Sequence, residues 1–306
     1  MELLLLKPRG FCAGVVRAIQ TVEKALEIWG KPIYVKHEIV HNRHVVSSLK
    51  NKGAVFVEDL NEVPIGEKIV YSAHGVSPWV REIARRKKLI EIDATCGLVT
   101  KIHSAVKRYA KNGYKIILIG KKKHVEVIGI ADEAPNDTVV IQKIEDIDAL
   151  NFSDDQKLFY ITQTTLSIDD VEEVISYLKQ KFKNIQTLPS SSICYATTNR
   201  QMALKKIIND VDLILVVGDP TSSNSSRLKE LAIKQNKKAY LINSEEEMKS
   251  EWFKNINRIG MTAGASTPED IVQRSIEKLF SFGLKKVNEI IYKTEDVVFE
   301  LPKGLN

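Results

Sequence analysis

Short apolar runs alternate with charged segments of helical period along most of the chain. In segments such as VEEVISYLKQKF and SSRLKELAIKQN, apolar residues recur every three or four positions, which is typical of a helix with one buried face. The apolar runs between such segments are short and β-rich, and the alternation predicts βα units on parallel sheets. The predicted strands are LLLLK, PIYVK, KIVYSA, LIEID, KIILIG, KLFYIT, LILVVG, AYLIN and RIGMTAG.

A weak internal repeat aligns the three cysteines of the chain. The segments CAGVVRAIQTVEKAL, CGLVTKIHSAVKRYA and CYATTNRQMALKKII begin at Cys12, Cys96 and Cys194, and each is apolar at the tenth, thirteenth and fourteenth positions after its cysteine. A basic residue follows each cysteine about a turn and a half later, at Arg17, Lys101 and Arg200. The pattern predicts that each cysteine lies at a helix N-terminus, where the dipole and the free backbone N–H groups favour a thiolate.

Polar loops recur at matching positions in the three segments, each directly after a predicted strand. One loop comes 29, 28 and 28 residues after the cysteine, at His41, His124 and Ser222, and a further loop follows at His74, Thr164 and Ser266. Parallel α/β sheets place ligand sites at the carboxyl ends of their strands. We therefore expect three similar α/β modules, at residues 1–95, 96–193 and 194–285, followed by a tail, 286–306, which packs back onto the body near the first module.

Composition and charge narrow the classes of partner. Lys and Arg number 45 against 39 Asp and Glu, a formal charge of +6 that is mild for 306 residues. The basic runs 85–88 and 121–123 are short, so solvated surface is favoured over a nucleic-acid partner, whereas a small anionic substrate is compatible with the charge. Residues 121–123 could steer such a substrate, although solvated surface is again the simpler reading.

The N-terminus and the cysteine count bear on the compartment. The apolar run in MELLLLKPRG is too short for a signal peptide or a membrane span, and no other segment approaches spanning length. Three scattered cysteines form neither a disulfide framework nor a CxxC zinc pattern. We expect a cytoplasmic protein with no membrane partner.

Three thiolates that meet in space repel one another and need a cation. Thiolates are soft ligands that select zinc or iron–sulfur clusters. A [4Fe-4S] cluster held by three cysteines keeps one iron free to bind substrate, and the chain has no fourth cysteine to close it. The ordinary alternative is that the cysteines are small buried hydrophobic residues; their equal placement in three repeats counts against it.

Several long motifs in one order carry a specific resemblance. They are PRGFCAGV, HEIVHNRHVV, SAHGVS, DATCGLVTK, HVEVIG, TQTTLS, CYATTNRQ, SSNSSRL, TAGAS and VVFELPK. With these motifs the chain resembles the 4-hydroxy-3-methylbut-2-enyl diphosphate reductases, which end the methylerythritol phosphate route to isoprenoids. The resemblance implies an α/β fold of three modules with small parallel sheets, in a pseudo-threefold trefoil around a central [4Fe-4S] cluster on Cys12, Cys96 and Cys194. It also implies that two electrons and two protons remove an allylic hydroxyl as water, giving isopentenyl and dimethylallyl diphosphate, with reduced ferredoxin or flavodoxin as electron donor.

The same motifs imply roles for individual residues. The diphosphate pocket is expected from donors in all three modules: His41, His74, His124, Ser222, Ser223, Asn224 and Ser266. The resemblance implies three catalytic residues: Glu126 delivers protons toward the leaving hydroxyl, Thr164 helps orient that hydroxyl or relays the proton, and His124 is the third. SSNSS follows a strand and opens a helix, a geometry that presents N–H groups to phosphate, so binding is favoured over mere capping.

Histidines outside these motif positions receive an ordinary structural reading. This applies to His37, His44 and His103. HEIVHNRH spaces three histidines as a helical zinc site would, but its β-rich context argues against one. Many relatives carry proline in place of Gly97 and Val125, so we expect both loops to be somewhat more flexible here.

Three rival functions remain open on the sequence. A zinc hydrolase would use cysteine and histidine ligands with Glu126 as base. A non-catalytic module would bind a phosphate ligand or nucleic acid without needing its cysteines. A pure electron carrier would keep the cluster, but an open iron in a polar pocket argues against it.

Overall fold

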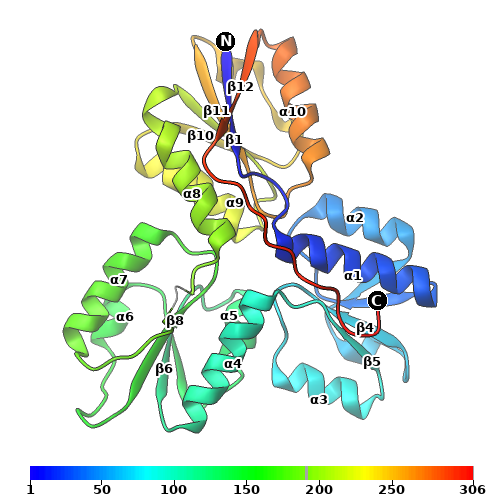
Figure 1. Ribbon diagram of the computed structural model, residues 1–306, viewed down its shortest axis with the longest axis vertical. Coiled ribbons are helices and arrows are strands. Elements are labelled where there is room, and N and C mark those ends of the chain that lie inside the picture. Colours follow the sequence, from blue (N-terminus) through cyan, green and yellow to red (C-terminus); the bar gives the residue numbers. More distant parts are fainter. Residues whose placement is uncertain (190–191, 306) are drawn as a thin grey trace. The chain divides into compact units, whose positions relative to one another are not determined.

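Within the described residues, the chain forms three sheets whose strands pair in parallel (Figure 1). The computed structural model describes residues 1–189 and 192–305. The strands are β1 Glu2–Lys7, β2 Ile33–Lys36, β3 Ala54–Val57, β4 Lys68–Tyr71, β5 Ile90–Asp93, β6 Lys115–Ile119, β7 Thr138–Ile141, β8 Leu158–Thr162, β9 Leu213–Val217, β10 Lys238–Ile242, β11 Arg258–Ala263 and β12 Lys286–Ile291. The helices are α1 Ala13–Trp29, α2 Arg43–Lys52, α3 Pro78–Arg86, α4 Gly97–Lys111, α5 Val125–Ala131, α6 Ile144–Asp148, α7 Ile168–Lys181, α8 Tyr195–Ile207, α9 Ser223–Lys234 and α10 Glu269–Ser281, and short 3₁₀ turns lie at Leu60–Glu62, Ile208–Asp210, Glu245–Glu247 and Ser250–Phe253.

The chain divides into two compact units. The first comprises residues 1–16, 41–47 and 195–298, and the second comprises residues 17–40, 48–194 and 299–306. The first unit holds the five-stranded sheet, in the order β10-β9-β11-β1-β12. The second unit holds a four-stranded sheet, β3-β2-β4-β5, and a three-stranded sheet, β7-β6-β8. No helix in the described residues is both long and apolar enough to span a lipid bilayer.

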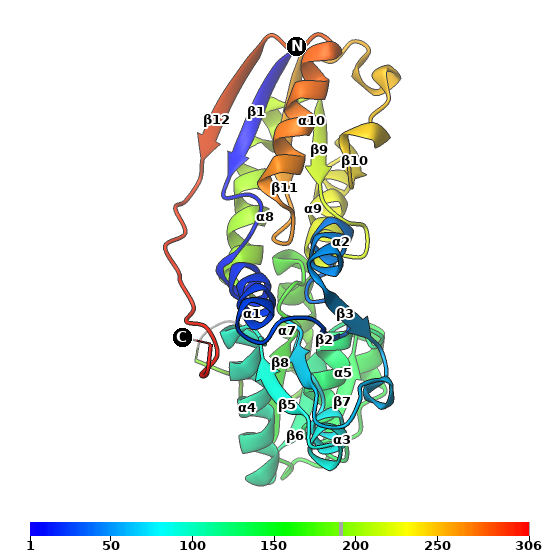
Figure 2. The ribbon, with the colours of Figure 1, turned by 90° about the vertical axis from the view of Figure 1, so that its right-hand side faces the viewer.

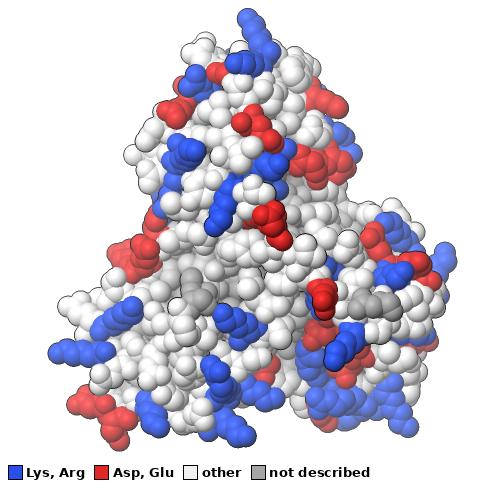
Figure 3. Space-filling model, viewed as in Figure 1, with Lys and Arg blue, Asp and Glu red and all other residues white. Residues whose placement is uncertain are grey.

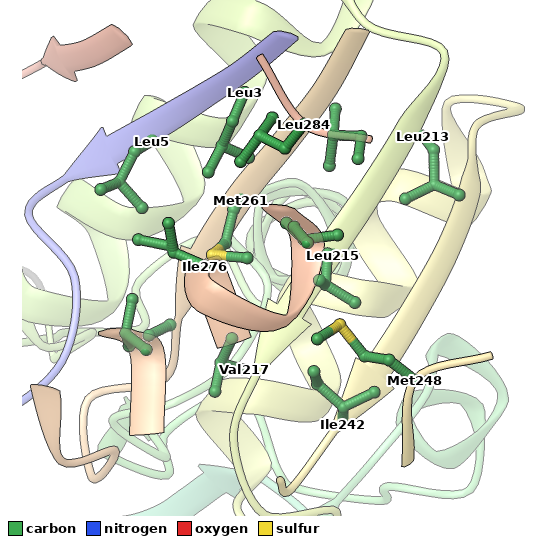
Figure 4. Close-up of a cluster of buried hydrophobic side chains, with 14 of the residues drawn as sticks. Leu3, Leu5, Leu213, Leu215, Val217, Ile242, Met248, Met261, Ile276 and Leu284 are labelled. Carbon is green, nitrogen blue, oxygen red and sulfur yellow. The ribbon is translucent and has the colours of Figure 1, made fainter. Parts of the chain in front are cut away.

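The five-stranded sheet is covered on both faces, as its continuous apolar strands require. Alternate residues of β1 and β9 point to opposite faces: Leu3, Leu5 and Leu215 join a core with Met261 and helix α10 (Figure 4). Leu4, Leu6, Ile214 and Val216 join the other core, which is closed by α8 and α9. The three-stranded sheet repeats the arrangement, with α4 and α5 on one face and α6 and α7 on the other.

The module boundaries expected from the sequence need correction at the two chain ends. β1 does not belong with the sheet of residues 33–93, because it lies between β11 and β12, with Leu3 opposite Ile259 and Val287. Figure 2 shows β1 and β12 side by side in this sheet. The first module therefore lacks a strand that was assigned to it, and the third gains both β1 and β12.

The tail is also arranged differently from the expectation. Its strand is Lys286–Ile291, whereas VVFEL at residues 297–301 is not in a strand. Beyond β12, the Glu300 carbonyl accepts a hydrogen bond from Arg17 at 2.6 Å, and Leu305 is buried in the second unit. The strand of the tail pairs within the five-stranded sheet, and the residues beyond it contact the second unit.

The other predicted elements agree with the structure. Each of the nine predicted strands overlaps an observed one, and β3, β7 and β12 are additional strands. Each cysteine directly precedes the first residue of a helix, namely α1, α4 and α8. The helix-start prediction for the cysteines is therefore confirmed.

Candidate functional site

The polar loops expected to bind ligand do follow the carboxyl ends of strands. His41, His74, His124, Thr164, Ser222 and Ser266 come after β2, β4, β6, β8, β9 and β11. The first unit contains His41, Ser222, Ser223, Asn224, Ser266 and Cys12. The second unit contains His74, His124, Glu126, Thr164, Cys96 and Cys194.

In the first unit, the TAGAS loop connects three of the expected site segments. The Ser266 hydroxyl donates to the His41 carbonyl at 2.9 Å. The Ala265 N–H donates to Asn224 Oδ1 at 3.0 Å, and the Ala265 carbonyl accepts from the Cys12 N–H at 3.1 Å. This one loop therefore brings Cys12 close to the polar residues that were expected to bind the diphosphate.

The start of α9 combines a helix cap with buried polar side chains. Ser222 is the N-cap, and its Oγ accepts from the Ser225 N–H at 3.4 Å. Ser222, Ser223 and Asn224 are each about 5 to 6% exposed. Ser222 therefore caps α9, the role that the sequence analysis placed below phosphate binding. The first N–H groups of this helix lie in the same loop region as the three polar side chains.

An aspartate fixes the loop before this helix start. The buried Asp219 carboxylate accepts from the Arg43 N–H at 3.1 Å and from Arg43 Nε at 3.2 Å. It also accepts from the Thr221 N–H at 2.9 Å and from the Thr221 hydroxyl at 2.7 Å. Burial alone would raise the pKa of Asp219, but the hydrogen bonds from Thr221 and Arg43 outweigh it and lower the pKa below its usual value.

In the second unit, Glu126 and Thr164 form a buried pair. Glu126 is only 2% exposed, and its Oε1 accepts from the Thr164 N–H at 2.7 Å while its Oε2 accepts from the Thr164 hydroxyl at 2.8 Å. The Thr164 carbonyl accepts from the Cys194 N–H at 2.9 Å. The carboxyl group, the hydroxyl group and one of the cysteines therefore lie together, although 68 residues separate Glu126 from Cys194 in the chain.

Two histidines and a second cysteine lie in the same unit. The rings of His74 and His124 are 6.1 Å apart between centroids, with their planes nearly perpendicular. His124 is the N-cap of α5, and its Nδ1 accepts from the Glu126 N–H at 3.2 Å. The Ala73 carbonyl, next to His74, accepts from the Cys96 N–H at 3.0 Å. His124 thus contacts His74 through its ring and Glu126 through its Nδ1 atom.

The three cysteines have the same local structure. All three are of intermediate burial. Each N–H donates to a carbonyl in a loop after the neighbouring strand, with Ala265 accepting from Cys12, Ala73 from Cys96 and Thr164 from Cys194. The chain segment before each cysteine lies beside that strand: β1 beside β11, β5 beside β4, and Gln186 in a parallel bridge to Phe159 of β8. This common pattern explains the repeat seen in the sequence.

The histidines given an ordinary reading have ordinary partners. His37 Nδ1 lies 2.8 Å from the Glu58 carboxylate, and His103 Nδ1 lies 2.8 Å from the Glu133 carboxylate. His44 Nε2 lies 2.9 Å from the Asn243 carbonyl oxygen. Residues 37–42 are not helical, so the helical zinc spacing of HEIVHNRH is not realised.

The sequence reading missed two polar residues that support the site loops. Asn42 is 1% exposed, and its Oδ1 accepts from the His44 N–H at 3.0 Å at the start of α2. Gln163 is fully buried, and its Oε1 accepts from the Lys121 N–H at 3.0 Å. Asn42 lies in the motif HEIVHNRHVV and Gln163 in the motif TQTTLS. Both motifs were recognised in the sequence, but a role was assigned only to the neighbouring residues His41 and Thr164.

The fold and the site define an α/β protein in which parallel sheets carry polar ligand loops and one helix-start cysteine each. Comparison with known proteins places it more closely: the chain belongs to the LytB protein family, whose model matches residues 3–280. A 4-hydroxy-3-methylbut-2-enyl diphosphate reductase from Protochlamydia amoebophila is 63% identical over 305 residues, which cover 100% of this chain and 97% of the relative. The enzyme of the same name from Chlamydia pneumoniae is 60% identical, with coverage of 99% and 98%.

A solved structure is also similar over nearly the whole chain. The E-1-hydroxy-2-methyl-but-2-enyl-4-diphosphate reductase from Plasmodium falciparum is 50% identical, and the match covers 99% of this chain and 96% of that one with a TM-score of 0.97. The expected family and the α/β class with parallel sheets are therefore confirmed.

Proposed function

We propose that this chain catalyses the reductive removal of the hydroxyl group of 4-hydroxy-3-methylbut-2-enyl diphosphate, giving isopentenyl and dimethylallyl diphosphate with two electrons and two protons. The observation that carries the proposal is the buried Glu126–Thr164 pair hydrogen-bonded through Thr164 to the backbone of Cys194. A proton source next to a thiol ligand suits a reaction in which water leaves as electrons arrive. Relatives named 4-hydroxy-3-methylbut-2-enyl diphosphate reductase match the chain over nearly all of its residues.

The donor set suits an iron–sulfur cluster. Cys12, Cys96 and Cys194 are only partly exposed and equivalent in local structure. Each also precedes a helix, whose N-terminal dipole favours a thiolate. We assign these three residues as ligands of a [4Fe-4S] cluster, which when bound supplies the electrons and one iron without a cysteine ligand.

The diphosphate is assigned to the polar residues of the strand-end loops. Ser222, Ser223 and Asn224 offer hydroxyl, amide and helix N–H donors from one unit, together with Ser266 and His41. His74 and His124 offer ring donors from the other. A buried dianionic group needs many donors, and charge-assisted hydrogen bonds are the stronger kind.

Proton delivery is assigned to Glu126 through Thr164. The Thr164 hydroxyl can donate and accept, so it can pass a proton on from Glu126 while the Thr164 N–H keeps the other carboxylate oxygen in place. Protonating the leaving hydroxyl lowers the barrier, and general-acid help of this kind is worth roughly 100-fold to 10,000-fold. His124 keeps the start of α5 in register with this pair.

The electron donor and the location follow from the family and the cysteines. We assign reduced ferredoxin or flavodoxin as the donor, since no GxGxxG fingerprint for a nicotinamide cofactor follows a strand. We also propose a cytoplasmic location, because three scattered cysteines that form no disulfide framework favour a reducing compartment.

The test is an anaerobic preparation assayed with the allylic diphosphate and a reduced viologen dye. A brown protein with broad visible absorption and turnover of the diphosphate supports the proposal. Cys12→Ser, Cys96→Ser and Cys194→Ser should each lose both the cluster and the turnover. A colourless protein that binds zinc, or cysteine variants with unchanged activity, would rule the proposal out.

A further inference from the structure

Arg200 connects the helix after one cysteine to the backbone before another. It lies in α8, which follows Cys194, and its side chain is fully buried. Its Nη2 donates to the Gly10 carbonyl at 2.7 Å, two residues before Cys12. Its Nη1 donates to the Ala196 carbonyl at 2.9 Å within the helix. The guanidinium group therefore binds the backbone just before Cys12, although Arg200 and Gly10 are 190 residues apart in the sequence.

Arg17 makes the corresponding connection to Cys96. It lies in α1, which follows Cys12. Its Nη1 donates to the Thr95 carbonyl at 2.9 Å, directly before Cys96, and its Nη2 donates to the Asp93 carbonyl at 3.2 Å. Arg17 and Arg200 are the basic residues that follow Cys12 and Cys194 in the repeat. In both cases the basic residue after one cysteine binds the backbone before another.

The C-terminal tail supplies the remaining partners of both arginines. The Glu295 carboxylate accepts from Arg200 Nη1, with both oxygens at 3.2 Å, and from Asn199 Nδ2 at 2.9 Å. The Glu300 carbonyl accepts from Arg17 Nε at 2.6 Å. Glu295 is 13% exposed, so its pairing with Arg200 is shielded from water.

The energetics make the tail contact with Arg200 decisive. A buried guanidinium without a counter-charge is strongly unfavourable, and removing one partner of a buried ion pair strongly destabilises the fold around it. Without Glu295, Arg200 gains by turning toward solvent, and the Gly10 carbonyl then loses its charged donor. The conformation of the segment before Cys12 thus depends on a residue in the tail.

We infer that Arg200 and Arg17 are positioning residues that hold the backbone before Cys12 and Cys96 in the ligand conformation, and that the tail residues Glu295 and Glu300 keep them in place. The inference rests on the proposed cluster site. It makes a prediction that a general stabilising role does not: each arginine acts on one particular cysteine.

The chain offers a matched pair of variants for the test. Glu295→Gln removes the carboxylate that pairs with Arg200, whereas Glu300→Gln leaves the backbone carbonyl that pairs with Arg17 unchanged. Arg200→Lys and Arg17→Lys keep the charge but lose the forked donor geometry. Thermal unfolding of each full-length variant identifies those that fold like the wild type.

The first measurement is the alkylation rate of each thiol in the full chain expressed without iron loading, read out peptide by peptide by mass spectrometry. We expect Glu295→Gln and Arg200→Lys to raise the rate at Cys12 by roughly tenfold, Arg17→Lys to raise it at Cys96, and Glu300→Gln to change neither, since a lost charge-assisted hydrogen bond shifts an opening equilibrium by about that factor. Equal acceleration at all three thiols, or none, would overturn the inference.

The second measurement uses the cluster-loaded protein. The electron paramagnetic resonance spectrum of the reduced cluster should change in Glu295→Gln and stay as in the wild type in Glu300→Gln. Identical spectra in the two variants would count against the inference. These outcomes can be told apart from a failure of the proposed function. If the proposed function is wrong, the wild type itself will have no cluster and no turnover. The alkylation rates of the three thiols will still test the roles of the two arginines.

Discussion

At the scale of single residues, Glu126 is buried next to neutral hydrogen-bond donors. Both of its oxygens accept from Thr164, and the two residues are 38 positions apart in the chain. A carboxyl group in this setting can hold or release a proton at a defined place, which an exposed glutamate could not do.

Glu126→Gln should remove the proton source while keeping the geometry. The glutamine carbonyl can still accept from the Thr164 N–H, and the glutamine amide can donate to the Thr164 hydroxyl. We expect kcat to fall by roughly 100-fold to 10,000-fold with little change in thermal stability. Steady-state assays with reduced viologen measure the first quantity and calorimetry the second. Thr164→Ser, which keeps the hydroxyl, is the control and should retain most activity; a glutamine variant with wild-type kcat would refute the role.

Asp219 gives a pH dependence of stability. Its pKa is lowered in the folded protein by hydrogen bonds from Thr221 and Arg43, which outweigh the effect of burial. A lowered folded-state pKa means that this stabilisation is complete above the ordinary pKa, about 4, and is lost as the pH falls through the folded-state value. The free energy of unfolding, measured by urea titration, should therefore drop below about pH 4 less steeply in Asp219→Asn than in the wild type. The exposed Asp154→Asn serves as the control; equal slopes in Asp219→Asn and the wild type would contradict the assignment.

At the scale of elements, the start of α9 shows how capping and binding can share one residue. Ser222 caps the helix, so Ser222→Ala should lower the free energy of unfolding by about 1 kcal/mol. Ser222→Asp keeps a good cap but adds a negative charge where the diphosphate is assigned. If Ser222 binds substrate, KM should rise about tenfold or more in the aspartate variant while its stability stays near the wild type. A wild-type KM in Ser222→Asp would leave Ser222 with the cap alone.

The structure also shows where Gly97 and Val125 lie, the two positions at which many relatives are expected to carry proline. Gly97 and Val125 are the first residues of α4 and α5, the helix position at which proline is well tolerated. A Cβ atom on Gly97 would lie 3.3 Å from the Phe299 ring, so any side chain at this position would come into tight contact with the tail.

The sequence predicted most elements but not all of their pairings. LLLLK shows that β1 is buried on both faces, yet nothing local says which sheet it enters, because strand pairing is decided by contacts more than 250 residues apart. KVNEII has the mixed exposure of an edge strand and was passed over, whereas VVFEL looked like a strand although Val298 is 88% exposed. Motifs pointed to the candidate site residues, but the Glu126–Thr164 contact and the tail contacts to Arg17 and Arg200 join residues far apart in the chain and could not be predicted from the sequence.

At the scale of the whole molecule, Lys and Arg lie among Asp and Glu on the face drawn in Figure 3. Exposed ion pairs along the chain include Lys24 with Glu27 and Arg85 with Glu82. Such pairs contribute little to stability.

The assignment of both chain ends to one sheet can be tested by unfolding the sheets separately. Met261 is fully buried in the core of the five-stranded sheet, and Ile69 is fully buried in the four-stranded sheet. Shortening either side chain to alanine should cost about 2 to 5 kcal/mol locally. Hydrogen–deuterium exchange then reports which strands lose protection with each core.

Met261→Ala should raise exchange in β9, β11, β1 and β12 and leave β2 and β4 protected, while Ile69→Ala should do the reverse. The informative peptide is Glu2–Lys7, since the module boundaries drawn from the sequence group it with β2, whereas the observed register places it between β11 and β12. If this peptide loses protection in Ile69→Ala and keeps it in Met261→Ala, the pairing of β1 described here is wrong. If it follows Met261, the third module is completed by β1 and β12, and the segment leading into Cys12 takes its conformation from strands more than 250 residues further along the sequence.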